Sequence, residues 1–194
     1  MKCSVFVAAS ADGYISTLDD GVDWLESSGN TEADMGEQPD MGFSHFMASV
    51  DCMIIGRKCM ERISSFNLSP EQWPYGDTRI ISLSNTVKDV PENLKGKVEI
   101  YSGDIPKLIA QLESEGLAHA YIDGGITITS FINLQLINEI TVFQVPVLLG
   151  EGKRLFGKIF NQIKLEKAQV HHYPNDFIQL KYQVNYQRIE NFHH

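Results

Sequence analysis

The stretch HAYIDGGITITSF, residues 119–131, decides the fold class. Its first part, residues 119–122, is a short and mostly apolar segment, which predicts a buried strand. The residues after Gly125 continue with helical spacing to Leu134, which predicts a helix. Two glycines between the halves let the backbone turn tightly and approach a neighbour or ligand closely. A strand that passes through a glycine turn into a helix is the repeating unit of a parallel α/β sheet.

Other parts of the chain repeat this order. Apolar segments predict strands at Ser4–Ala9, Cys52–Ile55, Arg79–Leu83 and Val98–Tyr101. One helix is expected to begin at Arg57. Another is expected to begin at Asp104-Ile105-Pro106, with Asp104 as its cap, and to end at Gly116. Strand and helix therefore alternate over the first two thirds of the chain, which predicts parallel crossovers in one sheet.

The last third of the chain contains strand signals only. Glu139–Leu149, Leu165–Val170 and Phe177–Tyr186 are strand-like, and Pro146 suggests an edge or a bulge. The turn residues 173–176 predict an antiparallel hairpin between the last two. We predict a single α/β domain over residues 1–188, with a mixed, mostly parallel sheet covered by helices on both faces. Residues 189–194 are interpreted as a tail, in part from a purification tag.

Composition limits the partners. The 194 residues carry 16 Lys and Arg against 25 Asp and Glu, a formal charge of -9, which repels nucleic acids and anionic membranes at long range. No apolar run approaches the ~20 residues that a bilayer span needs. The three cysteines match no metal-ligand spacing, so we predict no metal site and a reducing, cytoplasmic location.

Three motifs at predicted strand ends are candidates for ligand binding. Asp123-Gly124-Gly125 precedes a helix whose free amide groups favour a phosphate, although such a pair also serves as a simple turn. Arg57 and Lys58 follow Gly56 in a first helical turn, where cations are unfavourable unless an anion binds; a solvated basic pair is the alternative. Ser84-Asn85 offers hydroxyl and amide groups, which are also common in turns.

Taken together, the three motifs indicate a single ligand site. All three follow strands that we expect to be parallel, so they should meet at one edge of the sheet, where ligands of open α/β sheets bind. Two cations, two helix N-termini and a diglycine turn suit a diphosphate-bearing ligand such as a dinucleotide. The first strand is not followed by Gly-x-Gly-x-x-Gly, so the site is not of the Rossmann type.

An ordered set of motifs resembles a known family. It comprises Ala9-Ser10-Ala11-Asp12-Gly13-Tyr14-Ile15, Trp24-Leu25, Ile55-Gly56-Arg57-Lys58, Trp73-Pro74-Tyr75, Leu83-Ser84, Asp123-Gly124-Gly125, residues 145–152 (VPVLLGEG) and Leu155-Phe156. Over residues 1–186 the chain resembles the reductase domain of the bifunctional riboflavin-biosynthesis deaminase/reductase and its stand-alone relatives. That resemblance implies a dihydrofolate-reductase-like fold, an NADPH-dependent reductase and a homodimer.

The resemblance also implies roles for individual positions. Gly56, Arg57, Lys58 and Cys59 would meet the adenosine 2′-phosphate and diphosphate, and Ser84 and Asn85 would flank the adenosine. Gly124, Gly125, Ile126 and Thr127 would hold the diphosphate. Ala9 would lie near the nicotinamide, and Trp24 would face the substrate. Cys59 and Asn85 stand where relatives often carry Thr and Arg, which leaves NADH as the alternative cofactor.

The predicted function is transfer of a hydride to a small organic substrate of pterin, pyrimidine or carbonyl type. Asp123 is the candidate acid or base, with a turn-stabilising carboxylate as the alternative. The acidic segment 19–40 is predicted to act as a lid. Two other classes compete: a non-catalytic dinucleotide-binding module that senses redox state, and a scaffold with a vestigial pocket.

Overall fold

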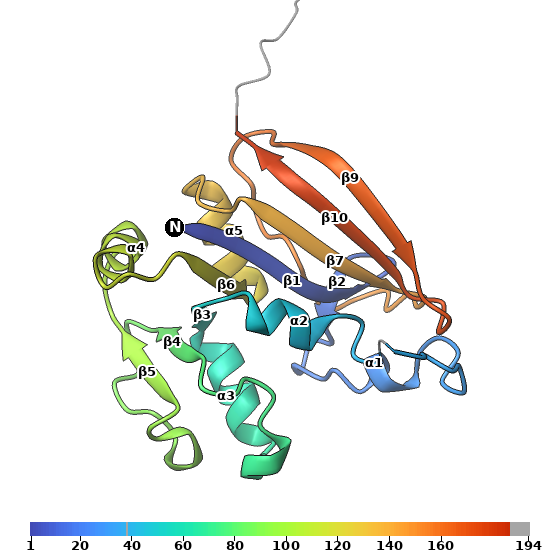
Figure 1. Cartoon of the computed structure of the whole chain (residues 1–194), viewed down its shortest axis with the longest axis horizontal. Coiled ribbons are helices and arrows are strands. Elements are labelled where there is room, and N and C mark those ends of the chain that lie inside the picture. The colour runs from blue at the N-terminus through green and yellow to red at the C-terminus, as the bar shows by residue number, and fades with distance from the viewer. Residues whose placement is uncertain (38, 187–194) are drawn as a thin grey trace, which may run out of the picture.

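The computed structural model describes residues 1–37 and 39–186 (Figure 1). The predicted boundary at residue 188 and the tail therefore lie outside the described residues. The strands are β1 Lys2–Ser10, β2 Tyr14–Ser16, β3 Cys52–Gly56, β4 Arg79–Leu83, β5 Val98–Tyr101, β6 His119–Asp123, β7 Glu139–Val145, β8 Lys153–Arg154, β9 Lys164–His172 and β10 Ile178–Asn185. The helices are α1 Trp24–Ser27, α2 Phe43–Ala48, α3 Arg57–Ser65, α4 Ile105–Ser114 and α5 Gly125–Asn133, with 3-10 turns η1 Pro70–Gln72 and η2 Glu92–Leu94.

One large sheet organises the chain. Its strand order is β5-β4-β3-β6-β1-β7-β10-β9. The six strands from β5 to β7 in this order pair in parallel, and β10 pairs antiparallel with β7 on one side and with β9, the strand before it in the chain, on the other. The predicted mixed sheet with a C-terminal antiparallel hairpin is confirmed. A second, two-stranded sheet of β2 and β8, absent from the prediction, lies beyond the end of β1.

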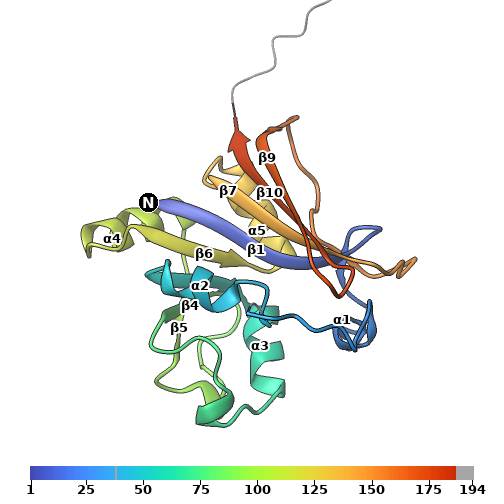
Figure 2. The same ribbon diagram turned by 45° about the vertical axis from the view of Figure 1, so that its right-hand side comes forward.

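Helices cover both faces of the parallel part of the sheet (Figures 1 and 2). On one face, α4 and α5 bury Leu112 and Phe131 against strand residues such as Ile54 and Ile122. The opposite face, with Met53 and Tyr121, packs against Met47 of α2 and Met60 of α3. Since successive side chains of a strand point to opposite faces, near-continuous apolar strands are the sequence pattern that two covered faces require.

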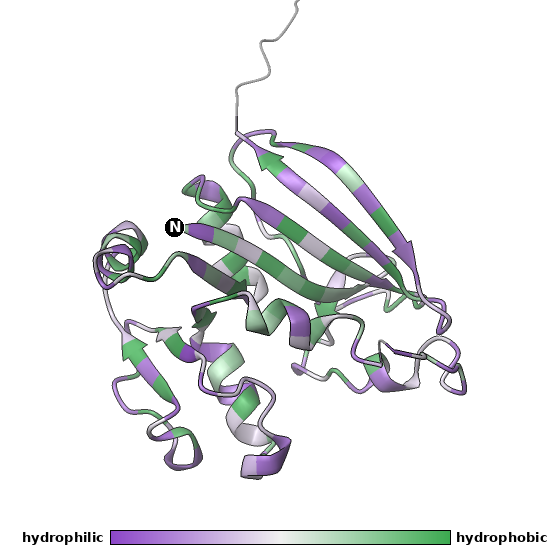
Figure 3. Cartoon of the chain, viewed as in Figure 1, coloured by the Kyte–Doolittle hydropathy of each residue, from purple (hydrophilic) through white to green (hydrophobic). Residues whose placement is uncertain are grey.

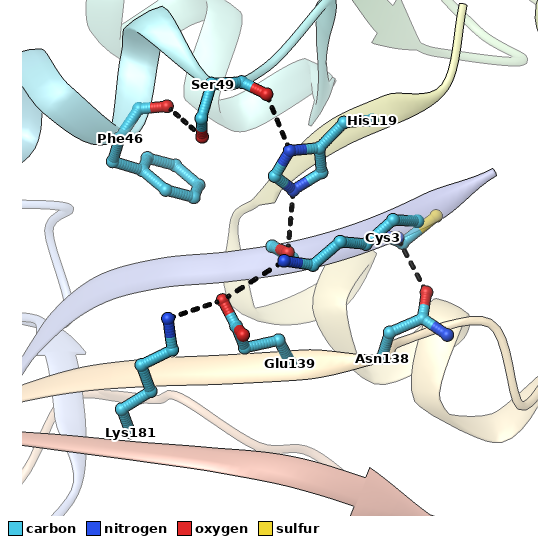
Figure 4. A network of polar contacts seen from close by, with 9 residues as sticks. Cys3, Phe46, Ser49, His119, Asn138, Glu139 and Lys181 are labelled. Carbon is cyan, nitrogen blue, oxygen red and sulfur yellow. Dashed lines mark hydrogen bonds and ion pairs between the residues drawn. The ribbon is translucent and has the colours of Figure 1, made fainter. Parts of the chain in front are cut away.

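Polar groups fasten the amino ends of the central strands (Figure 4). Nδ1 of His119 lies 2.7 Å from the Ser49 carbonyl oxygen, and its Nε2 lies 2.8 Å from the Ser4 hydroxyl. Glu139 pairs with Lys2 of β1 at 3.5 Å and with Lys181 of β10 at 3.0 Å. These contacts join α2 and four strands at the edge opposite the predicted ligand site.

Two local predictions need correction. The strand predicted over Glu139–Leu149 ends at Val145, because Pro146 has no N–H to donate to a ladder. Asp104 occupies the N-cap position of α4, but its carboxylate caps no amide and instead pairs with Lys107 at 3.4 Å. Gly116 takes φ +90° just beyond the end of α4, as predicted for the residue that ends it.

The acidic segment after β2 is fastened at several points. Trp24 is buried against Phe143 and Phe177. Asp20 forms an ion pair with Lys153, and the Asn30 amide donates to the Asn175 carbonyl at 3.1 Å. The segment therefore has apolar anchors that the sequence interpretation did not assign. None of the helices in the described part of the chain is long and apolar enough to cross a membrane.

Candidate functional site

The carboxyl ends of β3 and β6 lie side by side. The two strands pair in parallel with Ile55 opposite Asp123. The helices that follow them, α3 after Gly56 and α5 after Gly124, therefore begin next to each other. Neither α3 nor α5 has an acidic residue in its first turn. The prediction that Arg57 and the glycine pair share one edge of the sheet is confirmed. Two positive helix ends meet there, an arrangement that favours an anion.

Tight packing between chain segments explains the glycine pair. A methyl group on Gly124 would lie 2.6 Å from the Cys59 sulfur, and Gly124 takes φ +93°. A methyl group on Gly125 would lie 2.8 Å from the carbonyl oxygen of Arg154. The glycines therefore bring α3 and β8 against the start of α5. The close backbone approach that the sequence predicted is present, and it is made by the protein itself.

An internal partner neutralises part of the basic pair. Glu61, one turn along α3, forms an ion pair with Arg57 and lies 3.4 Å from Lys58. The argument that these cations need a bound anion is therefore wrong, because a carboxylate at i+4 and i+3 already compensates them. Three side chains together retain one positive charge, and all three are partly exposed. The pair can still meet a phosphate, in competition with Glu61.

Ser84 and Asn85 lie at the end of β4, one strand further from the glycine pair. The Ser84 hydroxyl is buried and accepts hydrogen bonds from the amides of Val87 at 2.9 Å and Thr86 at 3.3 Å. The Asn85 side chain accepts one from the Ser102 hydroxyl at 3.0 Å. The Ser84 side chain thus builds the local turn, which is the alternative that the sequence left open, whereas Asn85 ties this turn to the segment after β5.

Asp123 lies at the end of β6, on the face covered by α2 and α3. Burial raises the pKa of its carboxyl from the usual 3.8 to about 6. No Lys, Arg or His among residues 1–37 and 39–186 forms an ion pair with it. Burial and then the Asp123 charge raise the pKa values of Tyr75 and Cys59, so both groups lie near the carboxyl. Asp123 is partly buried, and a carboxyl with a pKa near neutrality can hold or give a proton.

Trp24 and Ala9 lie on opposite faces of the sheet. Trp24 is 9% exposed and packs on the same sheet face as Asp123, beyond Phe6. Its indole N–H is buried and has no hydrogen-bond partner in the described structure. Ala9 points to the opposite face, into the core beneath α5, so only its backbone is available to a ligand. A buried donor without a partner is expected where a ligand completes the site.

Asp12 is a structural residue of the neighbouring loop. Its carboxylate accepts hydrogen bonds from the Ser10 hydroxyl at 2.6 Å and from the Gly150 and Leu149 amides at 2.7 and 3.1 Å. The Ser10 hydroxyl first, and then these amides, lower the pKa of Asp12. This carboxylate fixes the turn after β1 against the loop after β7.

The remaining predicted cofactor residues lie at the start of α5. Ile126 is 82% exposed, and Thr127 is buried with its hydroxyl oxygen against Gly56. Three contributors were missed. Glu61 was visible from its spacing to Arg57. Tyr75 belongs to a motif quoted above, but its place near Asp123 and the approach of β8 to Gly125 are long-range contacts that local sequence does not show.

A hollow elsewhere on the molecule does not belong to this edge. A groove of about 660 Å³ lies at the amino ends of β4 and β5, lined by residues between 70 and 80 and by Gly96–Glu99. The Lys97 ammonium already covers the Trp73 ring there, at 4.3 Å from its centroid. In the described part of the chain, no three His, Cys, Asp or Glu side chains gather to hold a metal ion.

The fold is that of the dihydrofolate-reductase-like α/β proteins. Dihydrofolate reductase from Enterococcus faecalis, solved in complex with NADP(H), matches with a TM-score of 0.61 over 95% of this chain and 96% of its own, at 12% identity. Residues 2–179 match the RibD C-terminal domain. The chain belongs to the RibD C-terminal domain family, which confirms the resemblance seen in the sequence.

Stand-alone relatives match over nearly their full length. A solved protein from Shewanella sp. PV-4, named for riboflavin biosynthesis, is 33% identical and covers 95% of this chain and 99% of its own, with a TM-score of 0.85. YwjB of Bacillus subtilis strain 168, named as uncharacterized, is 28% identical over 166 residues, which are 84% of this chain and 87% of YwjB.

Proposed function

We propose that this protein is an NADPH-dependent reductase that delivers a hydride to a small organic substrate of pterin, pyrimidine or carbonyl type. The observation that carries the proposal is the meeting of two helix N-termini, at Gly56 and Gly124, beside the partly buried carboxyl of Asp123. Membership of the RibD C-terminal domain family supports the reductase class. The NADP(H) complex of a dihydrofolate reductase of the same fold supports the cofactor.

The residues present fit a dinucleotide. The first amides of α5, at Gly125, Ile126 and Thr127, would hold the diphosphate, and Arg57 and Lys58 would reach the 2′-phosphate. Either phosphate would compete with Glu61 for the guanidinium of Arg57. The cofactor, when bound, supplies the hydride.

Asp123 would handle the proton that accompanies the hydride. Reduction of a polar double bond adds a hydride to one atom and a proton to the other. A carboxyl with a pKa of about 6 is half protonated at pH 6, so it can donate a proton and then be protonated again by water. Turnover should therefore fall as pH rises through about 6. The unpartnered indole N–H of Trp24 would donate to a polar atom of the substrate.

The test begins with fluorescence titrations of the protein with NADPH and with NADH. Loss of reduced-nicotinamide absorbance is then followed with panels of pterins, pyrimidine amines and carbonyl compounds. Binding with turnover of any panel member supports the reductase. Binding without turnover of any of them favours the redox-sensing module, and absence of binding to both nucleotides contradicts the proposal.

A further inference from the structure

Tyr75, near the Asp123 carboxyl, has a hydroxyl without a partner in the protein. Most tyrosine hydroxyls of this chain form a hydrogen bond, namely those of Tyr14, Tyr101, Tyr121, Tyr173 and Tyr186. Across residues 1–37 and 39–186, only the hydroxyls of Tyr75 and Tyr182 have none. Since a phenol packed in protein usually pairs its hydroxyl, the exception near Asp123 points to a ligand.

The Tyr75 hydroxyl is open to a ligand, although its ring is packed. The ring lies against the buried cluster beneath α2 and α3 and is partly covered by it. In the described part of the chain, the buried polar side-chain atoms without a partner belong to Trp24, Arg62 and Ser82, so the Tyr75 hydroxyl is not sealed in the core. A fixed ring with an accessible hydroxyl is the form in which a protein presents a donor to a substrate.

The turn that carries Tyr75 is held in place by the protein itself. The Thr78 amide donates to the Tyr75 carbonyl at 3.1 Å. The Trp73 indole N–H donates to the Gly76 carbonyl at 3.2 Å. The rings of Trp73 and Phe43 stand edge-on to the Tyr75 ring, with centroid distances of 5.1 and 6.4 Å. These contacts fix the position of the phenol, so it needs little reorganisation when a substrate binds.

Tyr75 and Asp123 lie on the same face of the sheet. Tyr75 packs on the cluster that contains Ile55, and Ile55 lies opposite Asp123 in the pairing of β3 with β6. Burial first, and then the Asp123 charge, raise the pKa of Tyr75 above its usual value of 10. The phenol therefore keeps its proton at neutral pH and acts as a hydrogen-bond donor.

The surroundings of the two groups are largely apolar. β1 pairs with β6 only as far as Ser4 opposite Tyr121, although β6 continues to Asp123. β1 itself is hydrophobic along most of its length (Figure 3). The Tyr121 hydroxyl is already used, since it donates to the Phe6 carbonyl at 2.8 Å. Where polar groups are so few, a single free donor beside the carboxyl has a large effect on a reacting atom.

We propose that the Tyr75 hydroxyl donates a hydrogen bond to the substrate atom that Asp123 protonates, which makes Tyr75 a catalytic residue. This inference rests on the proposed reductase function. When a C=N or C=O bond is reduced, the hydride from the cofactor brings two electrons to the carbon, the π bond breaks, and negative charge develops on the nitrogen or oxygen. The Tyr75 hydrogen bond stabilises that charge, and the Asp123 carboxyl transfers its proton to the same atom and becomes a carboxylate. Tyr75 keeps its own proton.

The first test compares Tyr75→Phe with Tyr182→Phe in the full chain. Both variants remove a phenolic oxygen that has no partner in the described residues, but Tyr182 lies in β10, on the other face of the sheet. With a panel compound that the wild type reduces, Tyr75→Phe should lower kcat roughly a hundredfold at a nearly unchanged KM, because the hydrogen bond is strongest in the transition state. NADPH affinity, the urea midpoint and the fall of turnover above pH 6 should match the wild type. Tyr182→Phe should leave kcat unchanged.

The second test detects the contact without turnover. A fluorinated tyrosine replaces Tyr75 or, as the control, Tyr182, and the protein is titrated with the panel compounds in the presence of oxidised NADP. Fluorine NMR should show that the resonance at position 75 shifts while the resonance at position 182 does not, and calorimetry measures binding in parallel.

The outcomes separate this inference from the proposed function. A wild-type kcat for Tyr75→Phe, or a panel compound that binds without shifting the resonance at position 75, would overturn the inference and leave the reductase proposal standing. A shift at position 75 with no panel compound reduced would contradict the reductase alone. A protein that binds NADPH but no panel compound would overturn both.

Discussion

The two glycine-led helix starts at the ligand edge differ in how they treat charge. α3 begins with Arg57 and Lys58 and carries Glu61 one turn later, so its cations are paired within the helix. α5 begins with Gly125, Ile126 and Thr127, without any charge, and its amides alone face the edge. In α3, the helix with the basic sequence, the carboxylate of Glu61 therefore already neutralises part of the positive charge. A pair of cations at the start of a helix therefore predicts an anion site only if no carboxylate of the same helix already pairs with them.

The largest expected effect concerns the glycine that holds the two helices together. Gly124→Ala adds a methyl group 2.6 Å from the Cys59 sulfur at a residue with φ +93°. Overpacking and backbone strain together should lower the free energy of unfolding by roughly 3 kcal/mol or more, measured by urea denaturation. Gly116→Ala is the control, with φ +90° and no atom within 4 Å, and should cost about 1–2 kcal/mol. Equal losses would show that contact with Cys59 is unimportant.

The second effect concerns the opposite charges of Arg57 and Glu61 in α3. Arg57→Ala should weaken NADPH binding by ~1.5–3 kcal/mol, the value of a hydrogen bond to a charged group. Glu61→Gln should strengthen it, because the substitution frees the guanidinium. Both changes should be smaller for NADH if Arg57 meets the 2′-phosphate. Fluorescence titration of the two variants with both nucleotides measures this, and an unchanged dissociation constant for Arg57→Ala removes its role.

The third effect follows from the partly buried carboxyl of Asp123, at the end of β6. The folded pKa of Asp123, about 6, lies above the unfolded value of 3.8, so the folded state keeps its proton longer. Wild-type stability should therefore decrease as pH rises from about 4 to about 6. Asp123→Asn should remove this decrease and gain about 1–2 kcal/mol at pH 7, after allowance for partial hydration. Urea denaturation at several pH values decides; parallel curves for the two proteins would contradict the raised pKa.

The smallest effect tests whether the end of β4 belongs to the site. Ser84→Ala removes a buried acceptor for the amides of Thr86 and Val87, and should cost about 1 kcal/mol of stability. NADPH affinity should stay unchanged, because the hydroxyl is used within the turn. A weaker affinity at unchanged stability would instead assign Ser84 to the cofactor.

The sequence was sufficient for the parallel part of the sheet. Apolar runs such as Cys52–Ile55 and glycine turns such as Gly124-Gly125 are local signals, and parallel crossovers then bring their ends to one edge. The helix end at Gly116 was predictable for the same reason.

Features that depend on long-range contact were not predictable. Trp24 lies in an acidic, loop-like segment, and the other buried members of its cluster, such as Phe143 and Phe177, follow more than a hundred residues later. The pairing of β2 with β8 rests on strands of three and two residues, too short for any periodicity. The partners of Arg57 were the exception, because Glu61 stands at helical spacing and local analysis could have found it.

The position of β1 in the middle of the sheet has a consequence for biosynthesis. This strand is translated long before its two neighbours, β6 and β7, which begin at residues 119 and 139. A nascent chain therefore carries an apolar strand with both edges unpaired until about a hundred further residues have been translated. Folding of the central sheet must wait for the late segments, which makes the growing chain a natural client for chaperones.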